Sequence, residues 1–158
     1  MTDERRKYYE KKYRHLNLYF DHGRGWDVLT LLAAEELDSM WPKWMPFWLK
    51  HFWVYSMGKG VRMTKFAIFL VKCGITKPVY NMPPKFTQIK EKFGGLRLYT
   101  SYTTPTIMSL ENQSYNICEE CGSRTDIGTT SGWIKTICKS CAQKSDNTYN
   151  NWKPRNNG

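Results

Sequence analysis

Residues 25–40 carry apolar side chains at intervals of three and four positions, which is the spacing of one face of an α-helix. These apolar positions are Trp26, Leu29, Leu32, Ala33, Leu37 and Met40. Acidic residues occupy much of the other face, and Asp27 lies at the start, where the helix dipole favours an acid. We therefore expect an amphipathic helix that ends at Trp41-Pro42.

Residues 41–73 form the most aromatic part of the chain. Because Pro42 and Pro46 limit a helix before residue 46, the pattern predicts a helix over residues 46–57 and a buried helix or strand over residues 61–73. Aromatic side chains are enriched at the centres of protein interfaces. The candidates for contact with a protein partner are Trp41, Trp44, Trp48, Phe52, Trp53 and Tyr55. The alternative is an ordinary aromatic core, since a chain of this size cannot expose all of these rings without aggregating.

The segment FTQIKEKF (86–93) leads into Gly94-Gly95, and the segment LRLYTSY (96–102) leaves it with alternating apolar and polar positions, which predicts a β-hairpin with a tight turn at the two glycines. Pro105 suits the first turn of a short helix over residues 105–116. The expected fold is α+β, with N-terminal helices packed with the hairpin and with a four-cysteine module like a zinc ribbon. We expect three segments: a helical, aromatic and basic region (1–85), the hairpin plus cysteine module (86–142), and a polar, flexible tail (143–158).

Charge is distributed unevenly along the 158 residues. The formal net charge is +10, and residues 41–97 contain eleven lysines and arginines but one acid. Such a basic block favours an acidic partner, either a nucleic acid or a protein with an acidic surface. No apolar run reaches the length of a membrane-spanning helix, and no apolar stretch directly follows the basic start. We therefore expect a soluble cytoplasmic protein.

Four of the five cysteines form two CxxC pairs, Cys118/Cys121 and Cys138/Cys141, separated by sixteen residues. Two such pairs at this spacing are typical of a Zn²⁺ site, in which each turn directs two thiolates at one ion. Four sulfur ligands leave no open position, so the expected zinc is structural. Two disulfides are the alternative, which a reducing compartment disfavours. Cys73 lies in an apolar run and is expected in the core.

Three segments of the chain resemble a widespread set of small, uncharacterised proteins from tailed bacteriophages and prophages. These segments are QIKEKFGGLRLY (88–99), SYNICEECG (114–122) and GWIKTICKSC (132–141). The shared pattern is KEKFG-x-LRFY, a short helix, CExCG, and GW-xx-TLC followed by Cys or His. Those proteins also tend to carry a GW-containing amphipathic helix near the start, like Gly25-Trp26. The resemblance covers residues 25–40 and 86–142 and implies a phage accessory protein in the host cytoplasm, with no agreed activity.

The sequence argues against an enzyme. A zinc-knuckle nuclease of the HNH class needs a histidine base and further ligands near the knuckles, but His15, His22 and His51 all lie in the first third of the chain. No phosphate-binding loop, nucleophile elbow or His–Glu zinc motif is present.

Two kinds of binding therefore remain as the expected function. The first is a protein partner of the host or phage, in nucleic-acid machinery or defence, contacted through the aromatic block. The second is direct, non-sequence-specific binding of DNA or RNA through basic residues, with Phe93 and Tyr99 either stacking on bases or lying in the core of a small sheet. The basic candidates are Lys85, Lys90, Lys92, Arg97, Lys135 and Lys139. A virion component and a peripheral membrane protein are minor alternatives.

Overall fold

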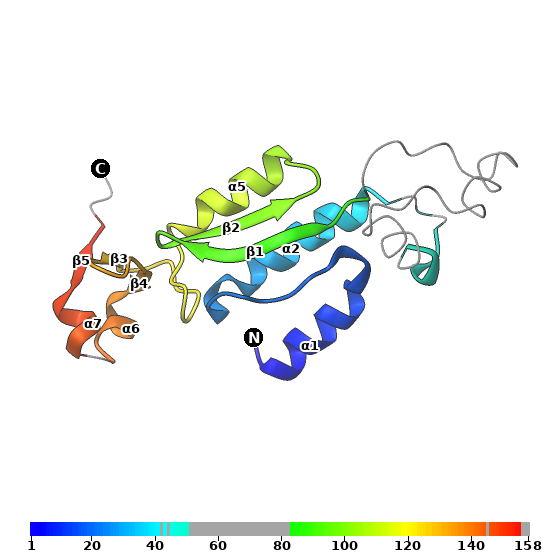
Figure 1. Ribbon diagram of the computed structural model, residues 1–158. Coiled ribbons are helices and arrows are strands. Elements are labelled where there is room, and N and C mark those ends of the chain that lie inside the picture. Colours follow the sequence, from blue (N-terminus) through cyan, green and yellow to red (C-terminus); the bar gives the residue numbers. More distant parts are fainter. Residues whose placement is uncertain (42, 44, 51–82, 145, 156–158) are drawn as a thin grey trace, which may run out of the picture.

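The computed structural model describes residues 1–41, 43, 45–50, 83–144 and 146–155, and its architecture is α+β, as predicted (Figure 1). The N-terminal half contains the helix α1 (Asp3–Lys12), the short 3₁₀ turns η1 (Arg14–Leu16) and η2 (Arg24–Trp26), and the helix α2 (Asp27–Ser39). The hairpin strands β1 (Phe86–Lys92) and β2 (Gly95–Thr100) and the helix α5 (Pro105–Ser114) follow. The cysteine module contains β3 (Ile127–Thr130), β4 (Thr136–Cys138), α6 (Lys139–Ala142), α7 (Asp146–Asn150) and β5 (Trp152–Pro154).

Helix α2 lies at the centre of the larger core and packs against α5, which also covers β2. Trp26, Leu29, Ala33 and Leu37 are buried there, as the helical spacing predicted. The prediction was wrong for Leu32 and Met40, which are exposed, while Thr30 and Ala34 are buried instead. One residue is about 100° around a helix, so Leu32 falls beside the covered face, which is centred on residues 30, 33 and 37.

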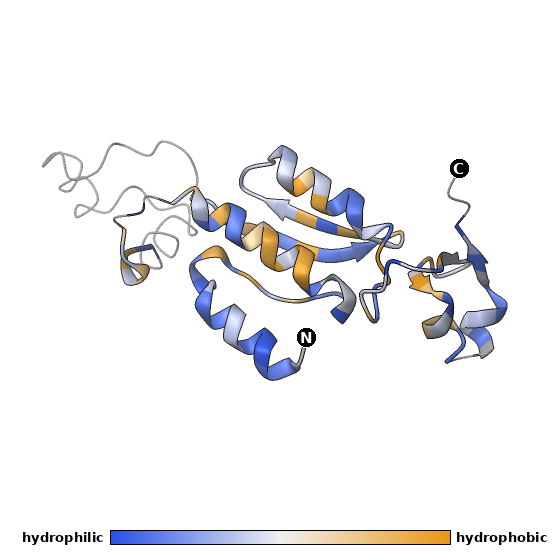
Figure 2. Ribbon diagram, turned by 180° about the vertical axis from the view of Figure 1, so that it is seen from behind, coloured by the Kyte–Doolittle hydropathy of each residue, from blue (hydrophilic) through white to orange (hydrophobic). Residues whose placement is uncertain are grey.

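Asp27 is buried, although the sequence placed it on the polar face of its helix. Its carboxylate accepts hydrogen bonds from the Arg6 guanidinium, with Nη2–Oδ1 at 2.6 Å. This ion pair attaches α1, a helix without any buried residue, to the start of α2. The contrast is visible in Figure 2, where α1 is mostly blue and α2 is mostly orange.

The predicted hairpin is present, with β1 and β2 antiparallel, but its turn is one residue earlier than the glycine pair suggested. Lys92 pairs with Gly95, so the turn residues are Phe93 (φ 53°) and Gly94 (φ 72°). Positive φ at both central residues identifies a type I′ turn, which matches the twist of the strands. Gly95 belongs to β2, where a Cβ atom would lie 2.5 Å from the Tyr115 ring.

Side chains from the helical part close both edges of this two-stranded sheet. On β2, the Leu96 amide donates to the Ser114 hydroxyl and the Leu98 amide donates to the Glu111 carboxylate, both from α5. On β1, the Ile89 amide donates to the Tyr19 hydroxyl. These bonds satisfy strand amides that a single hairpin would leave open to other chains. Helix α5 begins where predicted, with the Thr104 hydroxyl accepting from the Ile107 amide.

The cysteine module has a small core of its own, made by Cys118, Cys138 and Cys141 with Ile137 and Ala142, and Ile127 and Trp152 flank it. The hairpin, which the sequence grouped with this module, instead shares the core of the N-terminal helices. The described part of the polar segment 143–158 contains secondary structure. There α7 forms, and β5 pairs with β3 in a sheet of order β4-β3-β5.

The aromatic block is described only in part. Residues 47–50 are helical, which agrees with the start of the helix predicted for residues 46–57. The rest of that helix and the whole predicted element over residues 61–73 lie outside the described residues. Within the described part of the chain, no helix combines the length and apolar character needed to cross a membrane.

Candidate metal centre and hairpin face

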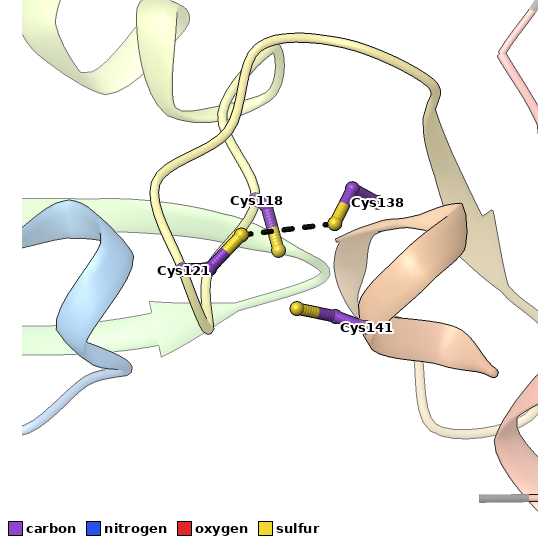
Figure 3. A group of neighbouring side chains, drawn as sticks. All are labelled: Cys118, Cys121, Cys138 and Cys141. Atoms are coloured by element: carbon purple, nitrogen blue, oxygen red, sulfur yellow. Dashed lines mark hydrogen bonds between the residues drawn. The ribbon is translucent and has the colours of Figure 1, made fainter. Parts of the chain in front are cut away.

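The four cysteines come together in the fold and lie close enough to hold one metal ion. Their sulfur atoms are all within 4.8 Å of one another, and Cys121 Sγ lies 3.7 Å from Cys138 Sγ. Figure 3 shows that the side chains of the first knuckle (residues 118–122) and the second knuckle (residues 138–142) point toward a common centre. A disulfide requires about 2.05 Å between sulfurs, and all four cysteines are free thiols.

The surroundings of the sulfurs act on their ionisation in opposite directions. Burial raises the pKa of the Cys138 thiol, but hydrogen bonds from the Ser140 hydroxyl and from Cys141 outweigh it and bring the pKa to about 6. Burial raises the pKa of Cys118. Burial, together with the neighbouring thiols of Cys121 and Cys138, also raises the pKa of Cys141. Crowded thiolates repel one another, and a bound cation removes that penalty.

The first knuckle packs directly on the chain that leads into α2. The Gly25 amide donates to the Glu119 carbonyl at 2.7 Å, and the Trp26 indole N–H donates to the Ile117 carbonyl at 2.9 Å. A Cβ atom on Gly25 would lie 1.9 Å from the Cys118 carbonyl oxygen, so only glycine permits this approach. Gly122 adopts a φ of 81°, which is the left-handed conformation expected for a knuckle glycine.

Glu119 is a buried carboxyl group within this contact. One oxygen accepts a hydrogen bond from the Gly23 amide at 3.3 Å, while Oε2 has no hydrogen-bond partner in the described structure. Burial raises the pKa of Glu119, which favours its protonated form. The carboxyl therefore contributes to the contact between the knuckle and Gly23, and it lies outside the group of four metal-ligand candidates.

The tip of the hairpin is attached to the strand that leads into the second knuckle. The buried Thr136 hydroxyl donates to the Gly94 carbonyl at 2.6 Å. A Cβ atom on Gly94 would lie 3.1 Å from the Ile134 side chain. The hairpin tip and the two knuckles thus adjoin one another, in contacts where glycine backbones approach other backbones or side chains.

One side of the hairpin carries a basic and aromatic surface, here called the hairpin face. It consists of Lys90, Lys92, Arg97 and Tyr99 on β1 and β2, with Phe93 at the turn; Lys92, Phe93 and Tyr99 are exposed, and Lys90 and Arg97 are half-buried. Lys90 and Arg97 are directly opposite each other across the strands, and like charges in this position are destabilising. The Lys90 ammonium lies 5.3 Å from the centre of the Tyr99 ring. Leu96 and Leu98 on the opposite side point into the core.

Phe93 and Tyr99 are exposed, at 68% and 42%, so the alternative that they are core residues is wrong. The Phe93 ring stands at the turn with the Lys92 ammonium 5.4 Å from its centre. A bulky residue with positive φ is strained, and type I′ turns favour Asn or Gly there. Strained residues cluster at functional sites, so Phe93 is a candidate residue of a binding surface.

Two residues of this surface escaped the sequence analysis. Tyr115 covers Gly95 on the same side as Arg97, and its ring lies 5.5 Å from the Arg97 guanidinium and 5.6 Å from that of Arg155. The Arg155 guanidinium also donates to the Tyr115 carbonyl. No pattern in the sequence singled out Tyr115. Arg155 directly follows β5, a three-residue strand that the polar C-terminal segment gave no pattern to predict.

The remaining basic candidates do not join the hairpin face. Lys85 is half-buried before β1, and its carbonyl accepts from the Ser101 amide. Lys135 lies beside the cysteine module with its ammonium 3.4 Å from the Glu120 carboxylate, and Lys139 begins α6. Of the six cations singled out, the fold therefore brings Lys90, Lys92 and Arg97 together.

The aromatic candidates for a protein interface divide into three groups. Trp41 is buried in the main core, and its indole N–H donates to the Pro84 carbonyl, so its proposed role as an interface residue is corrected. Trp48 is 68% exposed. Trp44, Phe52, Trp53 and Tyr55 lie outside the described residues.

The described histidines make structural contacts. His22 is placed by Nδ1, 2.8 Å from the Gly23 carbonyl, and by Nε2, 2.7 Å from the Thr30 hydroxyl. Burial lowers the pKa of His22. His15 is buried with Nε2 2.7 Å from the Asp38 carboxylate, which also binds Lys50. His51 lies outside the described residues.

Comparison with known proteins adds no relative. No family model matches this chain, and neither the curated proteins nor the solved structures include a significant match.

Proposed function

We propose that this protein is a non-enzymatic, zinc-binding accessory protein that binds single-stranded nucleic acid without sequence specificity through the hairpin face. Phe93 carries the proposal, because it places an exposed ring in a strained backbone conformation at the turn, beside the Lys92 ammonium. Exposed rings stack on unpaired bases, and lysines and arginines bind the phosphates. Arg155 and Tyr115 extend this surface from the neighbouring module.

Zinc is the metal that best suits the four sulfurs. A tetrahedral site with metal–sulfur bonds of about 2.3 Å has sulfur–sulfur edges of about 3.8 Å. The distance of 3.7 Å between Cys121 and Cys138 supports this geometry. Four thiolates leave no position for a substrate or a water molecule, which supports a structural role.

The resemblance to tailed-phage proteins supports a role in the cytoplasm of an infected bacterium, where the protein would act on host or phage nucleic acid. A host or phage protein with an acidic surface is the other proposed partner. The hairpin face carries the nucleic-acid proposal further, because its side chains are described and its two rings are exposed, whereas most of the aromatic block lies outside the described residues.

Replacing Phe93 by Asn should separate binding from stability. Asn-Gly is a preferred type I′ turn, so we expect F93N to stabilise the fold by about 1 kcal/mol. Loss of one stacking ring should weaken binding of a labelled single-stranded 12-mer by about tenfold. Urea unfolding and fluorescence anisotropy measure the two effects.

The control for this experiment is F93Y, which keeps both the ring and the backbone preference and should leave affinity and stability near the wild-type values. An F93N protein that is more stable but binds the 12-mer as tightly as wild type would contradict the proposed role of the ring.

A further inference from the structure

A hollow of about 590 Å³ lies between the loop that joins β3 to β4 and the helix α7, beside the cysteine cluster. This volume falls in the range of small-ligand sites, about 300–1,000 Å³. Trp133, Lys135, Lys144, Asn147 and Asn151 are among the residues that line it. It lies in the cysteine module, and none of the residues of the hairpin face lines it.

Trp133 is 76% exposed, the most exposed large apolar side chain in the described part of the protein. Its backbone is nevertheless held firmly. The Thr130 hydroxyl donates to the Trp133 carbonyl at 2.7 Å and accepts from the Lys135 amide at 2.9 Å. The Ser131 amide donates to the Asn151 carbonyl, which ties the loop to the chain after α7. A rigid loop therefore presents an indole ring to solvent at the hollow.

The other lining groups favour a planar, polar ligand. Asn147, Thr148 and Ser131 provide hydrogen-bonding groups suited to the edge of a base. Two lysines, Lys135 and Lys144, can approach a phosphate, although Lys135 also contacts the Glu120 carboxylate. Cys141 is part of the lining, and a zinc ion with four thiolates carries a net negative charge. Stacking on Trp133 must therefore contribute more than charge to any binding here.

The hollow is connected to the hairpin face through the tip of the hairpin. The Thr136 hydroxyl donates to the Gly94 carbonyl, and the side chain of Ile134, which follows Trp133 and is 40% exposed, would lie 3.1 Å from a Cβ atom on Gly94. Phe93 at the tip and Trp133 in the loop are thus exposed rings on adjoining segments.

We propose that the hollow receives one unpaired base of a bound single strand, stacked on Trp133 with its phosphate beside Lys135 or Lys144. The inference rests on the proposed function and adds a second, stacking-dominated site to it. Such a site requires an unpaired base, so it gives the protein a preference for single strands over duplexes.

The test compares W133A with wild type in binding a thymidine 12-mer, a uridine 12-mer and a duplex of the same length, at low and moderate salt. We expect W133A to bind both single strands about tenfold more weakly at each salt concentration and the duplex as wild type does. The slope of affinity against salt should stay unchanged, because no phosphate contact is lost. W133F should retain most of the affinity, and W48A, which removes a similarly exposed ring elsewhere, should retain all of it.

Each outcome decides the inference. Loss for both 12-mers supports a site for either nucleic acid, and loss for one assigns the site to DNA or to RNA. If W133A binds the single strands as tightly as wild type does while F93N still weakens binding, the proposal that the hollow binds a base is contradicted. The proposed function then remains supported. If wild type binds neither 12-mer, both proposals fall.

Discussion

Removing the metal should unfold the cysteine module while the helical core stays folded. The module buries only a handful of apolar side chains, including Ile137 and Ala142, so the proposed zinc must supply most of its stability. Structural zinc contributes about 10–16 kcal/mol in zinc-finger peptides, which exceeds or matches the whole stability of a typical domain. After chelation we expect amides of β3, β4 and β5 to lose protection from hydrogen exchange, while those of α2 and α5 keep it.

Cysteine variants provide the matched comparison. C138S should lose the bound zinc and reproduce the exchange pattern of the chelated protein. C73S alters the cysteine that the sequence assigns to the core, and it should retain one zinc per chain. Protection in residues 127–154 that survives complete chelation would contradict a metal-dependent module.

Replacing Gly25 by Ala should destabilise the contact between the first knuckle and α2 by about 3 kcal/mol or more. A Cβ atom at 1.9 Å from the Cys118 carbonyl oxygen and 2.5 Å from the Gly122 amide nitrogen must displace backbone, which cannot rotate away as a side chain can. The displacement would also break the bond from the Gly25 amide to the Glu119 carbonyl. Urea unfolding of zinc-loaded protein measures the loss.

Gly132 offers a control of the same chemistry without the clash. It has a φ of 79°, and a Cβ atom added there would have no neighbouring atom within 4 Å. G132A therefore costs only the left-handed backbone preference, about 1 kcal/mol. Equal stability of G25A and G132A would show that the knuckle does not pack on Gly25 as described.

The hairpin, the short helix and the cysteine cluster were predictable because each depends on local rules. A glycine pair between two short runs with apolar positions, the second of them alternating, predicts a hairpin, and CxxC spacing predicts a shared centre whatever lies between. Thr104 and Pro105 form a local start for α5. These signals need no knowledge of distant residues.

The remaining features depend on contacts between distant segments. The sequence placed the turn at Gly94-Gly95, whereas it lies at Phe93-Gly94, and Gly95 belongs to β2 beneath the Tyr115 ring. Asp27 is buried because Arg6, twenty-one residues earlier, pairs with it. The strand β5 is only three residues long, and its pairing with β3 could not be read from a polar tail. The helical spacing also predicted that Leu32 and Met40 would be buried, whereas the covered face of α2 contains Thr30 and Ala34 instead.

The most direct test of the hairpin face is the salt dependence of single-strand binding by wild type and by the double variant K90A/R97A. For single strands, the logarithm of affinity falls with the logarithm of salt by about 0.7 for each phosphate contact. If Lys90, Lys92, Arg97 and Arg155 each contact a phosphate, the wild-type slope should be about −3, and the variant should show about −1.4. Equal slopes for the two proteins, or an affinity that does not change with salt, would contradict nucleic-acid binding by this surface.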